Sequence, residues 1–169
     1  MPQVWLSIGS NMDRERSIYG AVKSLQDAFG ELVLSSVYES KAVGFDGDPF
    51  YNMVAGLGTA LSARSLNDRL REIEERHGRV RGGEKFSSRT LDIDLLLYGN
   101  EVIHEGEIEI PRDEITQYAF VLLPLAEVAG EMKHPVNGCT YQKLWDAFDP
   151  GQQRLWRVEL DLKPLAAQR

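Results

Sequence analysis

Two aspartates, Asp92 and Asp94, stand one residue apart inside an apolar run that extends from Leu91 to Gly99. The run is short and rich in strand-forming residues, and the Gly-Asn pair at its end is a turn signal, so it predicts a β-strand. Alternate side chains share one face of a strand, which puts both carboxylates on one side with Cα atoms roughly 6.6 Å apart. Burying two unpaired negative charges is costly. The pair therefore predicts a cation site, and its hard oxygen ligands suit two Mg²⁺ ions about 3.5–4 Å apart.

A basic segment lies just before this strand. Residues 69–89 carry seven Lys and Arg and four Glu, a local charge of +3 in a chain whose formal net charge is −7. A local basic patch on an acidic protein favours a small phosphate-bearing ligand over nucleic acid or an anionic membrane. For residues 69–76 a solvated helix face is an equally good interpretation.

Composition indicates an ordinary globular protein. The 169 residues, 43% hydrophobic and 27% charged, predict a single domain spanning residues 1–169. One cysteine, Cys139, allows no internal disulfide and fits a reducing compartment. The N-terminus has no signal-peptide pattern, and the longest apolar run, 119–126, is too short to span a bilayer. We therefore expect a cytoplasmic protein, and we expect a monomer.

The elements that would position the aspartates follow from hydrophobic periodicity. Predicted strands cover residues 4–8, 32–38, 52–61 and 91–99. Helical spacing predicts one helix between the cap Asp13 and the stop Gly30, and another between Ser62 and Gly78. The order β-α-β-β-α-β predicts a ferredoxin-like α+β sheet covered by helices on one face.

The remaining segments are assigned by the same signals. Residues 101–103 are expected to form a short partner strand. Further helices are predicted at 119–129 and 140–148, and the period-two alternation of 156–162 predicts a last, half-exposed strand. The glycine-rich, polar segments 41–49 and 78–88 are predicted to be loops, the second a mobile lid.

Four blocks of sequence, in order and at the right spacing, resemble the 6-hydroxymethyl-7,8-dihydropterin pyrophosphokinase family of folate biosynthesis. They are Ser7–Asn11, Gly78–Arg81, Arg89–Gly99 and Phe120–Leu125, extended by His134-Pro135-Val136. The block Arg-Thr-Leu-Asp-Ile-Asp is the most specific. The resemblance implies that the β,γ-pyrophosphoryl unit of ATP, the co-substrate, is transferred to the hydroxymethyl oxygen of the pterin, with release of AMP.

The resemblance also implies roles for individual residues. Asp92 and Asp94 would bind two Mg²⁺ ions that straddle the triphosphate, and Arg79 and Arg89 would complete the catalytic set by neutralising phosphate charge. The implied pterin-binding residues are Ser40, Val43, Phe50, Asn52, Phe86 and Phe120. The implied nucleotide-binding residues are Arg71, Glu74, Arg81, Lys85, Arg89 and Arg112. Without the resemblance, the two phenylalanines Phe50 and Phe120 would be read as core residues.

The chain departs from the family pattern on the nucleotide side. Arg112 stands where the family has a histidine, and Tyr118 stands where it has an arginine. Glu107 and Glu109 add negative charge, which repels a triphosphate unless these side chains point away from it. We therefore expect the chain to keep the pterin pocket of the family and to have a nucleoside pocket that differs from it.

Two other functions stay open from the sequence. One is a diverged paralogue that binds a pterin or nucleotide without this transfer, or uses another phosphoryl donor. The other is an RNA-binding or protein-interaction module on a ferredoxin-like sheet. The acidic charge and the lack of aromatic RNA-stacking motifs on the strands disfavour the second.

Overall fold

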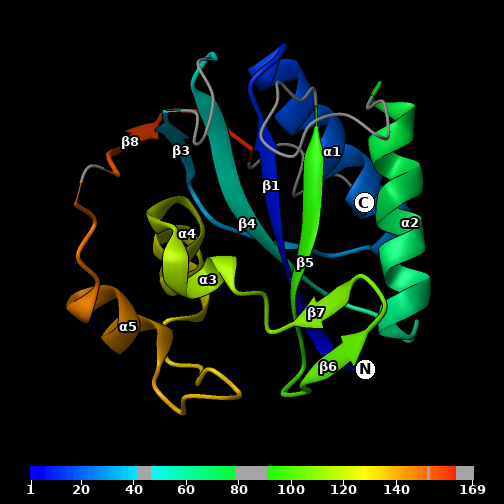
Figure 1. Cartoon of the computed structure of the whole chain (residues 1–169). Coiled ribbons are helices and arrows are strands. Elements are labelled where there is room, and N and C mark those ends of the chain that lie inside the picture. The colour runs from blue at the N-terminus through cyan, green and yellow to red at the C-terminus, as the bar shows by residue number, and fades with distance from the viewer. Residues whose placement is uncertain (42–46, 79–90, 152, 163–169) are drawn as a thin grey trace.

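The computed structural model describes residues 1–41, 47–78, 91–151 and 153–162, and one antiparallel sheet organises them (Figure 1). Its strands are β1 (Gln3–Ser10), β2 (Val33–Leu34), β3 (Val37–Ser40), β4 (Phe50–Gly58), β5 (Asp92–Tyr98) and β8 (Leu155–Val158). The strand order is β5-β1-β4-β3-β8, and β2 pairs with β4. All of these pairs are antiparallel. The predicted α+β class is confirmed, and the sheet is antiparallel.

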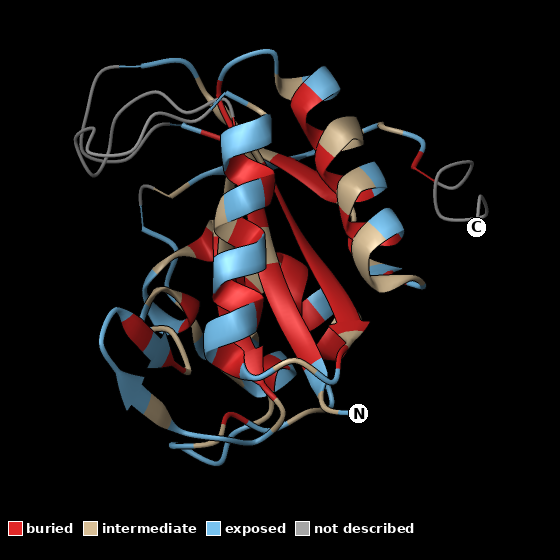
Figure 2. Cartoon of the chain, turned by 90° about the vertical axis from the view of Figure 1, so that its right-hand side faces the viewer, coloured by how far each residue is buried: buried red, intermediate tan, exposed pale blue. Residues whose placement is uncertain are grey.

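Helices cover both faces of this sheet, so the expectation of helices on one face is wrong. The helices are α1 (Arg14–Phe29), α2 (Ala63–Arg76), α3 (Glu114–Gln117), α4 (Ala119–Ala129) and α5 (Tyr141–Ala147). The first two pack with Leu6 and Ile8 of β1, whereas α4 and α5 pack with Trp5 of β1 and Val54 of β4. Because neighbouring strand residues point to opposite faces, the central strands are apolar on both sides. Figure 2 shows the buried residues of the sheet and the buried inner side of α2.

The helix ends follow the predicted capping signals closely. Ser62 caps α2, and its side chain accepts a hydrogen bond from the Ser65 N–H at 3.2 Å. Asp13 and Gly30 flank α1 as predicted, although Asp13 adopts a left-handed conformation (φ 47°) and makes no side-chain cap. The bounds of α4 are those predicted from its apolar spacing.

The predicted strand 32–38 is wrong in its continuity, because it is split into β2 and β3. Ser35 lies at the break. Its N–H donates to the Val54 carbonyl at 3.0 Å, and its hydroxyl accepts from the Val54 N–H at 2.8 Å. The hydroxyl thus takes a place that a backbone carbonyl would otherwise fill in the ladder. At the first strand the difference is smaller, since β1 continues two residues beyond the predicted end and includes Gly9 and Ser10.

A second correction concerns residues 101–103, which do not extend the main sheet. Instead β6 (Ile103–Glu105) pairs with β7 (Ile108–Ile110) in a separate two-stranded hairpin. Gly106 in its turn has a left-handed backbone, φ 60°, which glycine adopts without strain. The last predicted strand is shorter than expected, as β8, and α3 was not predicted. From residue 79 onward the expected lid lies outside the described residues.

Among the helices of the described ranges, none combines the length and apolar character needed to cross a membrane.

Gly56 on β4 provides a test of how tightly the sheet packs. A Cβ atom at Gly56 would lie 2.5 Å from the Trp5 ring, whereas a Cβ at Gly58, two residues along, would meet no atom closer than 3.7 Å. We expect Gly56→Ala to lower the free energy of unfolding by about 1–3 kcal/mol through overpacking. Gly58→Ala, the matched control, should change it by less than about 0.5 kcal/mol. Urea unfolding of both variants measures the difference, and equal stabilities would contradict the packing described.

Candidate active site

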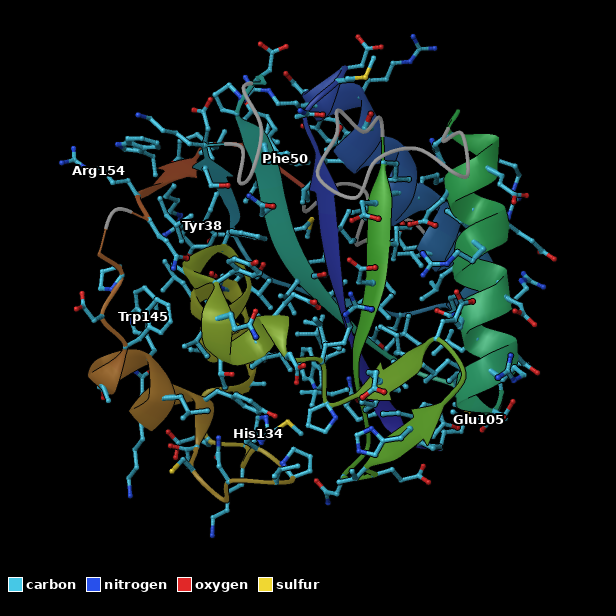
Figure 3. All side chains as sticks on the ribbon, viewed as in Figure 1. Tyr38, Phe50, Glu105, His134, Trp145 and Arg154 are labelled. Atoms are coloured by element: carbon cyan, nitrogen blue, oxygen red, sulfur yellow. The ribbon has the colours of Figure 1, made fainter. Side chains whose placement is uncertain are left out.

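The candidate residues of the strands gather at one end of the sheet, where β1 and β3 end and β4 and β5 begin. Gly9 on β1 stands opposite Asp92 on β5 and opposite Asn52 on β4. Residues paired across an antiparallel ladder point to the same face. Asp92, Gly9 and Asn52 therefore form a row on the face that α4 covers, and Asp94 belongs to the next row. Figure 3 labels Phe50 at this end of the sheet, while Glu105 and His134 lie at the opposite end.

The two carboxylates on β5 repel each other, and this repulsion adds to the effect of burial on the pKa of Asp94. Burial, followed by the charge of Asp92, raises the pKa of Asp94 to about 7, while Arg112 and Arg71 act in the opposite direction. Burial alone would lower the pKa of both arginines, yet the neighbouring carboxylates raise it. Both aspartates are partly buried. The predicted placement of the pair on one face of a strand is confirmed, and the predicted cation between the carboxylates stays a prediction.

The outer edge of β5 explains how these arginines reach Asp94. The Ile93 N–H donates to Glu74 Oε2 at 2.7 Å, and Glu74 Oε1 accepts from Arg71 at 2.9 Å. Further along the same strand, the Arg112 N–H donates to the Leu96 carbonyl at 3.1 Å. Glu74 is only 1% exposed, so its buried charge is compensated by these contacts. Its predicted contact with a nucleotide stays a prediction.

Two acidic residues that could repel a triphosphate, Glu109 and Glu114, have partners of their own. Glu114 accepts a hydrogen bond from the Arg112 side chain. On the β6–β7 hairpin, Glu109 lies 2.7 Å from His104 Nδ1, and Glu107 is exposed. The hairpin residue Glu105 lies at the end of the sheet opposite Phe50 (Figure 3).

On the candidate pterin side, Asn52 is buried and oriented by a neighbour. Its Nδ2 donates to Ser40 Oγ at 2.8 Å. A Cβ atom at Gly9 would lie 3.4 Å from Asn52 Oδ1 and 3.8 Å from the Phe50 ring. Gly9 lies on β1, between Asn52 on β4 and Asp92 on β5. Because Gly9 has no side chain, the surface beside Asn52 and Phe50 stays uncovered at this position. A planar ligand with donors and acceptors on its edge could bind an amide in this setting.

Phe120, near the start of α4, is stacked on Tyr118. Their ring centroids are 5.0 Å apart with planes inclined by 19°. Tyr118 occupies the position where the resemblance leads one to expect an arginine, so an aromatic contact stands in place of a charge. The predicted sandwich of a ligand ring between Phe50 and Phe120 stays a prediction.

An unpredicted cluster ties α4 to the sheet. Glu127 accepts hydrogen bonds from the Ser36 N–H at 3.0 and 3.1 Å, from the Ser36 hydroxyl at 2.9 Å, and from the Tyr38 hydroxyl at 2.7 Å. Burial and the Glu127 carboxylate raise the pKa of Tyr38 to about 12. Figure 3 places Tyr38 between β3 and α4. An exposed glutamate on an apolar helix gives no sequence signal for such a role.

Of the residues that sequence reasoning did not assign to the site, Gly9 had a usable signal. A glycine inside a strand often marks a close approach of a ligand or of another backbone. Six predicted residues lie outside the described residues: Val43, Arg79, Arg81, Lys85, Phe86 and Arg89.

Within the described ranges no group of three or more His, Cys, Asp and Glu side chains is placed to hold a metal ion. The Asp92–Asp94 pair is a smaller ligand set. It is the kind that Mg²⁺ accepts when substrate phosphates and water supply the remaining oxygens.

Comparison with known proteins shows which family this chain resembles. Residues 5–130 match the model of the 7,8-dihydro-6-hydroxymethylpterin-pyrophosphokinase (HPPK) family. The chain is 36% identical over 139 residues to the 2-amino-4-hydroxy-6-hydroxymethyldihydropteridine pyrophosphokinase of Haemophilus influenzae, covering 80% of this chain and 86% of that protein. It is 34% identical over 152 residues to the protein of the same name from Aquifex aeolicus, covering 89% of this chain and 92% of that protein.

Solved structures agree on the fold. The crystal structure of Plasmodium falciparum HPPK-DHPS wild type with pterin and p-hydroxybenzoate superimposes with a TM-score of 0.69 at 16% sequence identity. The match covers 86% of this chain and 41% of that chain, so the present chain spans about two fifths of the larger protein.

The raised pKa of Asp94 predicts a pH-dependent stability. In the unfolded chain this carboxyl titrates near pH 4, so between about pH 4 and 7 the folded state binds more protons and loses stability as pH rises. We expect Asp94→Asn to exceed the wild type in free energy of unfolding by at least about 1.4 kcal/mol at about pH 8, with no advantage at about pH 4. Urea unfolding with a chelator present measures it. The control Asp68→Asn, at an exposed position of α2, should change the free energy of unfolding by less than about 0.5 kcal/mol. A pH-independent effect of Asp94→Asn would contradict the explanation.

The buried contacts of Glu74 predict a second difference in the free energy of unfolding between variants. Removing this buried carboxylate leaves the Ile93 N–H without its acceptor and takes a hydrogen-bond partner from Arg71. Glu74→Ala should therefore lower the free energy of unfolding by about 3–5 kcal/mol. Glu74→Gln keeps an acceptor and should cost less. The control is Glu72→Ala on the same helix, whose contact with Arg69 is 3.8 Å long and exposed, with an expected cost below about 1 kcal/mol. Chemical unfolding compares the three variants. Equal losses for Glu74→Ala and Glu72→Ala would show that the β5 edge does not depend on Glu74.

Proposed function

The chain belongs to the 7,8-dihydro-6-hydroxymethylpterin-pyrophosphokinase family, and from this membership we propose its reaction. It transfers the pyrophosphoryl group of ATP to the hydroxymethyl oxygen of 6-hydroxymethyl-7,8-dihydropterin, in folate biosynthesis. A bond forms between that oxygen and the β-phosphorus, and the bond from the β-phosphorus to the oxygen bridging it to the α-phosphorus breaks. AMP leaves with that oxygen, and the hydroxyl proton is released.

The observation that carries the proposal is the row across β5, β1 and β4. Asp92 on one side of Gly9 and Asn52 on the other share a face of the sheet, with Gly9 adding no side chain between them. A pterin held at Asn52 would therefore extend its hydroxymethyl arm toward the aspartates. In-line phosphoryl transfer needs positioning and charge neutralisation more than covalent help.

Asp92 and Asp94 are proposed to bind two Mg²⁺ ions. Burial and, after it, the charge of Asp92 raise the pKa of Asp94, and the two arginines offset this only in part. A divalent cation would neutralise the charge of the two carboxylates. Bound there, magnesium would neutralise phosphate charge and make the hydroxymethyl oxygen a better nucleophile. The chain's own part is to hold the two carboxylates in place through the bonded edge of β5.

Asn52 is proposed to form hydrogen bonds with the edge of the pterin ring. Because Ser40 accepts one of its amide hydrogens, the amide orientation is set before the ligand binds. Phe50, Phe120, Val43 and Phe86 are the proposed apolar contacts, and offset stacking on an aromatic ring adds about 0.5–1.5 kcal/mol to burial.

Arginines supply the proposed contacts with ATP. Arg71 and Arg112 lie beside the aspartates, and a guanidinium can bind two phosphate oxygens at once. Further nucleotide contacts are proposed for Glu74, Arg79, Arg81, Lys85 and Arg89. The pairing of Arg112 with Glu114 supports a nucleotide side that differs from the family pattern.

Further proposals concern the fold, the oligomeric state, the location and the partners of the chain. Strands β5-β1-β4-β3 with α1 and α2 are proposed to be a ferredoxin-like unit, which the order of the elements supports. The chain is proposed to act as a single-domain monomer in the cytoplasm. Its negative charge supports small-molecule substrates and no nucleic-acid or membrane partner.

The activity test follows AMP and the pterin diphosphate by chromatography, with ATP, the pterin and Mg²⁺ supplied. We expect product from the wild type, none without a divalent cation, and kcat lowered by at least about 100-fold in Asp92→Asn and Asp94→Asn, because charge neutralisation is the main contribution of such sites. The exposed Asp68→Asn is the control and should keep wild-type kcat.

Two results would count against the proposal. Wild-type turnover in Asp92→Asn and Asp94→Asn would remove the aspartates from the mechanism. Calorimetry that shows tight pterin binding and negligible ATP binding, with no AMP formed, would support a pterin-binding paralogue instead.

A further inference from the structure

A side chain from the segment between α5 and β8 binds the junction between α3 and α4. Gln153 Oε1 accepts a hydrogen bond from the Ala119 N–H at 2.8 Å, and Gln153 Nε2 donates to the Gln117 carbonyl at 3.1 Å. These two backbone groups flank Tyr118, whose own backbone is extended (φ −123°, ψ 128°). One amide therefore holds the backbone on both sides of Tyr118.

The ends of the two helices explain why the junction needs such a partner. The first N–H groups and the last carbonyls of a helix have no partner within it. Tyr118 is the N-cap of α4, and its side chain makes no capping hydrogen bond. Its ring stacks on Phe120 instead. Gln153 supplies the acceptor from 34 residues away in sequence, so Tyr118 can serve as a stacking partner while the Ala119 N–H keeps a hydrogen bond.

The same segment reaches the other side of the candidate pterin site. Leu155, two residues after Gln153, pairs with Ser40 of β3. Ser40 in turn orients Asn52. Figure 1 shows the chain passing from α5 to β8 on the side of the sheet where α4 lies. Residues 153–158 therefore contact both the helix that carries Phe120 and the strand that carries Ser40.

We propose that Gln153 is a positioning residue for pterin binding, which sets Phe120 relative to Asn52. This inference rests on the proposed function, because it takes Phe120 and Asn52 as the pterin contacts. Gln153 acts through the backbone of residues 117–119. Its loss therefore displaces the start of α4 and changes the affinity for the pterin, while the carboxylates on β5 and the arginines beside them keep their places.

Two substitutions separate the roles of the two hydrogen bonds. Gln153→Met has nearly the same shape and removes both bonds. Gln153→Glu keeps the acceptor for the Ala119 N–H, but it replaces the donor to the Gln117 carbonyl with a carboxylate oxygen. The matched control is Gln142→Met, because the Gln142 side chain makes one exposed bond, to Asp146 at 2.9 Å on α5.

We expect Gln153→Met to raise the KM and the Kd for the pterin by about 5- to 30-fold, the factor that one or two ordinary hydrogen bonds represent. The KM for ATP should not change. Gln153→Glu should restore at least part of the affinity, and Gln142→Met should match the wild type. Hydrogen exchange of the Ala119 amide should accelerate in Gln153→Met and stay slow in Gln153→Glu.

The outcomes separate this inference from the proposed function. A wild type that forms AMP and pterin diphosphate, together with a Gln153→Met variant of unchanged pterin KM, overturns the inference and leaves the function standing. A parallel rise of the KM for ATP and the KM for the pterin also overturns it, because that pattern reports a general loss of structure. A wild type that binds no pterin overturns both.

Discussion

The open edge of β5 is the constraint on which the site depends. An edge strand presents backbone groups that need partners, and β5 forms the end of the sheet. Glu74 takes up the Ile93 N–H, and the Arg112 N–H takes up the Leu96 carbonyl. Each contact also brings an arginine to the aspartates, Arg71 as the partner of Glu74 and Arg112 by its own backbone. Satisfying the strand edge and surrounding the carboxylates with positive charge are therefore one structural solution.

The two faces of the sheet contribute differently to the site. The α1 and α2 face supplies a large apolar core, in which Leu66, Leu70 and Ile73 of α2 are fully buried. The opposite face carries the row of Asp92, Gly9 and Asn52, and α4 covers it only in part. Glu127 holds α4 to Ser36 and Tyr38, and Gln153 holds its start. Polar contacts with distant segments therefore add to the apolar packing that positions α4.

Much of this arrangement could be predicted from local sequence. The alternation around Asp92 and Asp94 predicted a strand with both carboxylates on one face, and Ser62 and Gly30 marked helix ends, because these signals act over a few residues. The break at Ser35 could not be predicted, since it depends on bonds to Val54, 19 residues away. The pairing of residues 103–105 with β7 rather than with the main sheet likewise depends on which strands meet in space. The partners of Asp94 and the stacking of Tyr118 on Phe120 are tertiary contacts, and for them the family resemblance supplied positions without geometry.

The pairing of β8 with β3 has a consequence for synthesis of the protein. Gly9 is made well before Gln153 and Leu155, which leave the ribosome more than a hundred residues later. Contacts so distant along the chain form slowly and require most of the polypeptide to be available. A nascent chain can thus build α1, β4 and α2 early, but it cannot complete this end of the sheet until synthesis has passed β8. Ligand affinity would then be acquired only after β8 has been synthesised, later than the elements that carry Gly9 and Asn52.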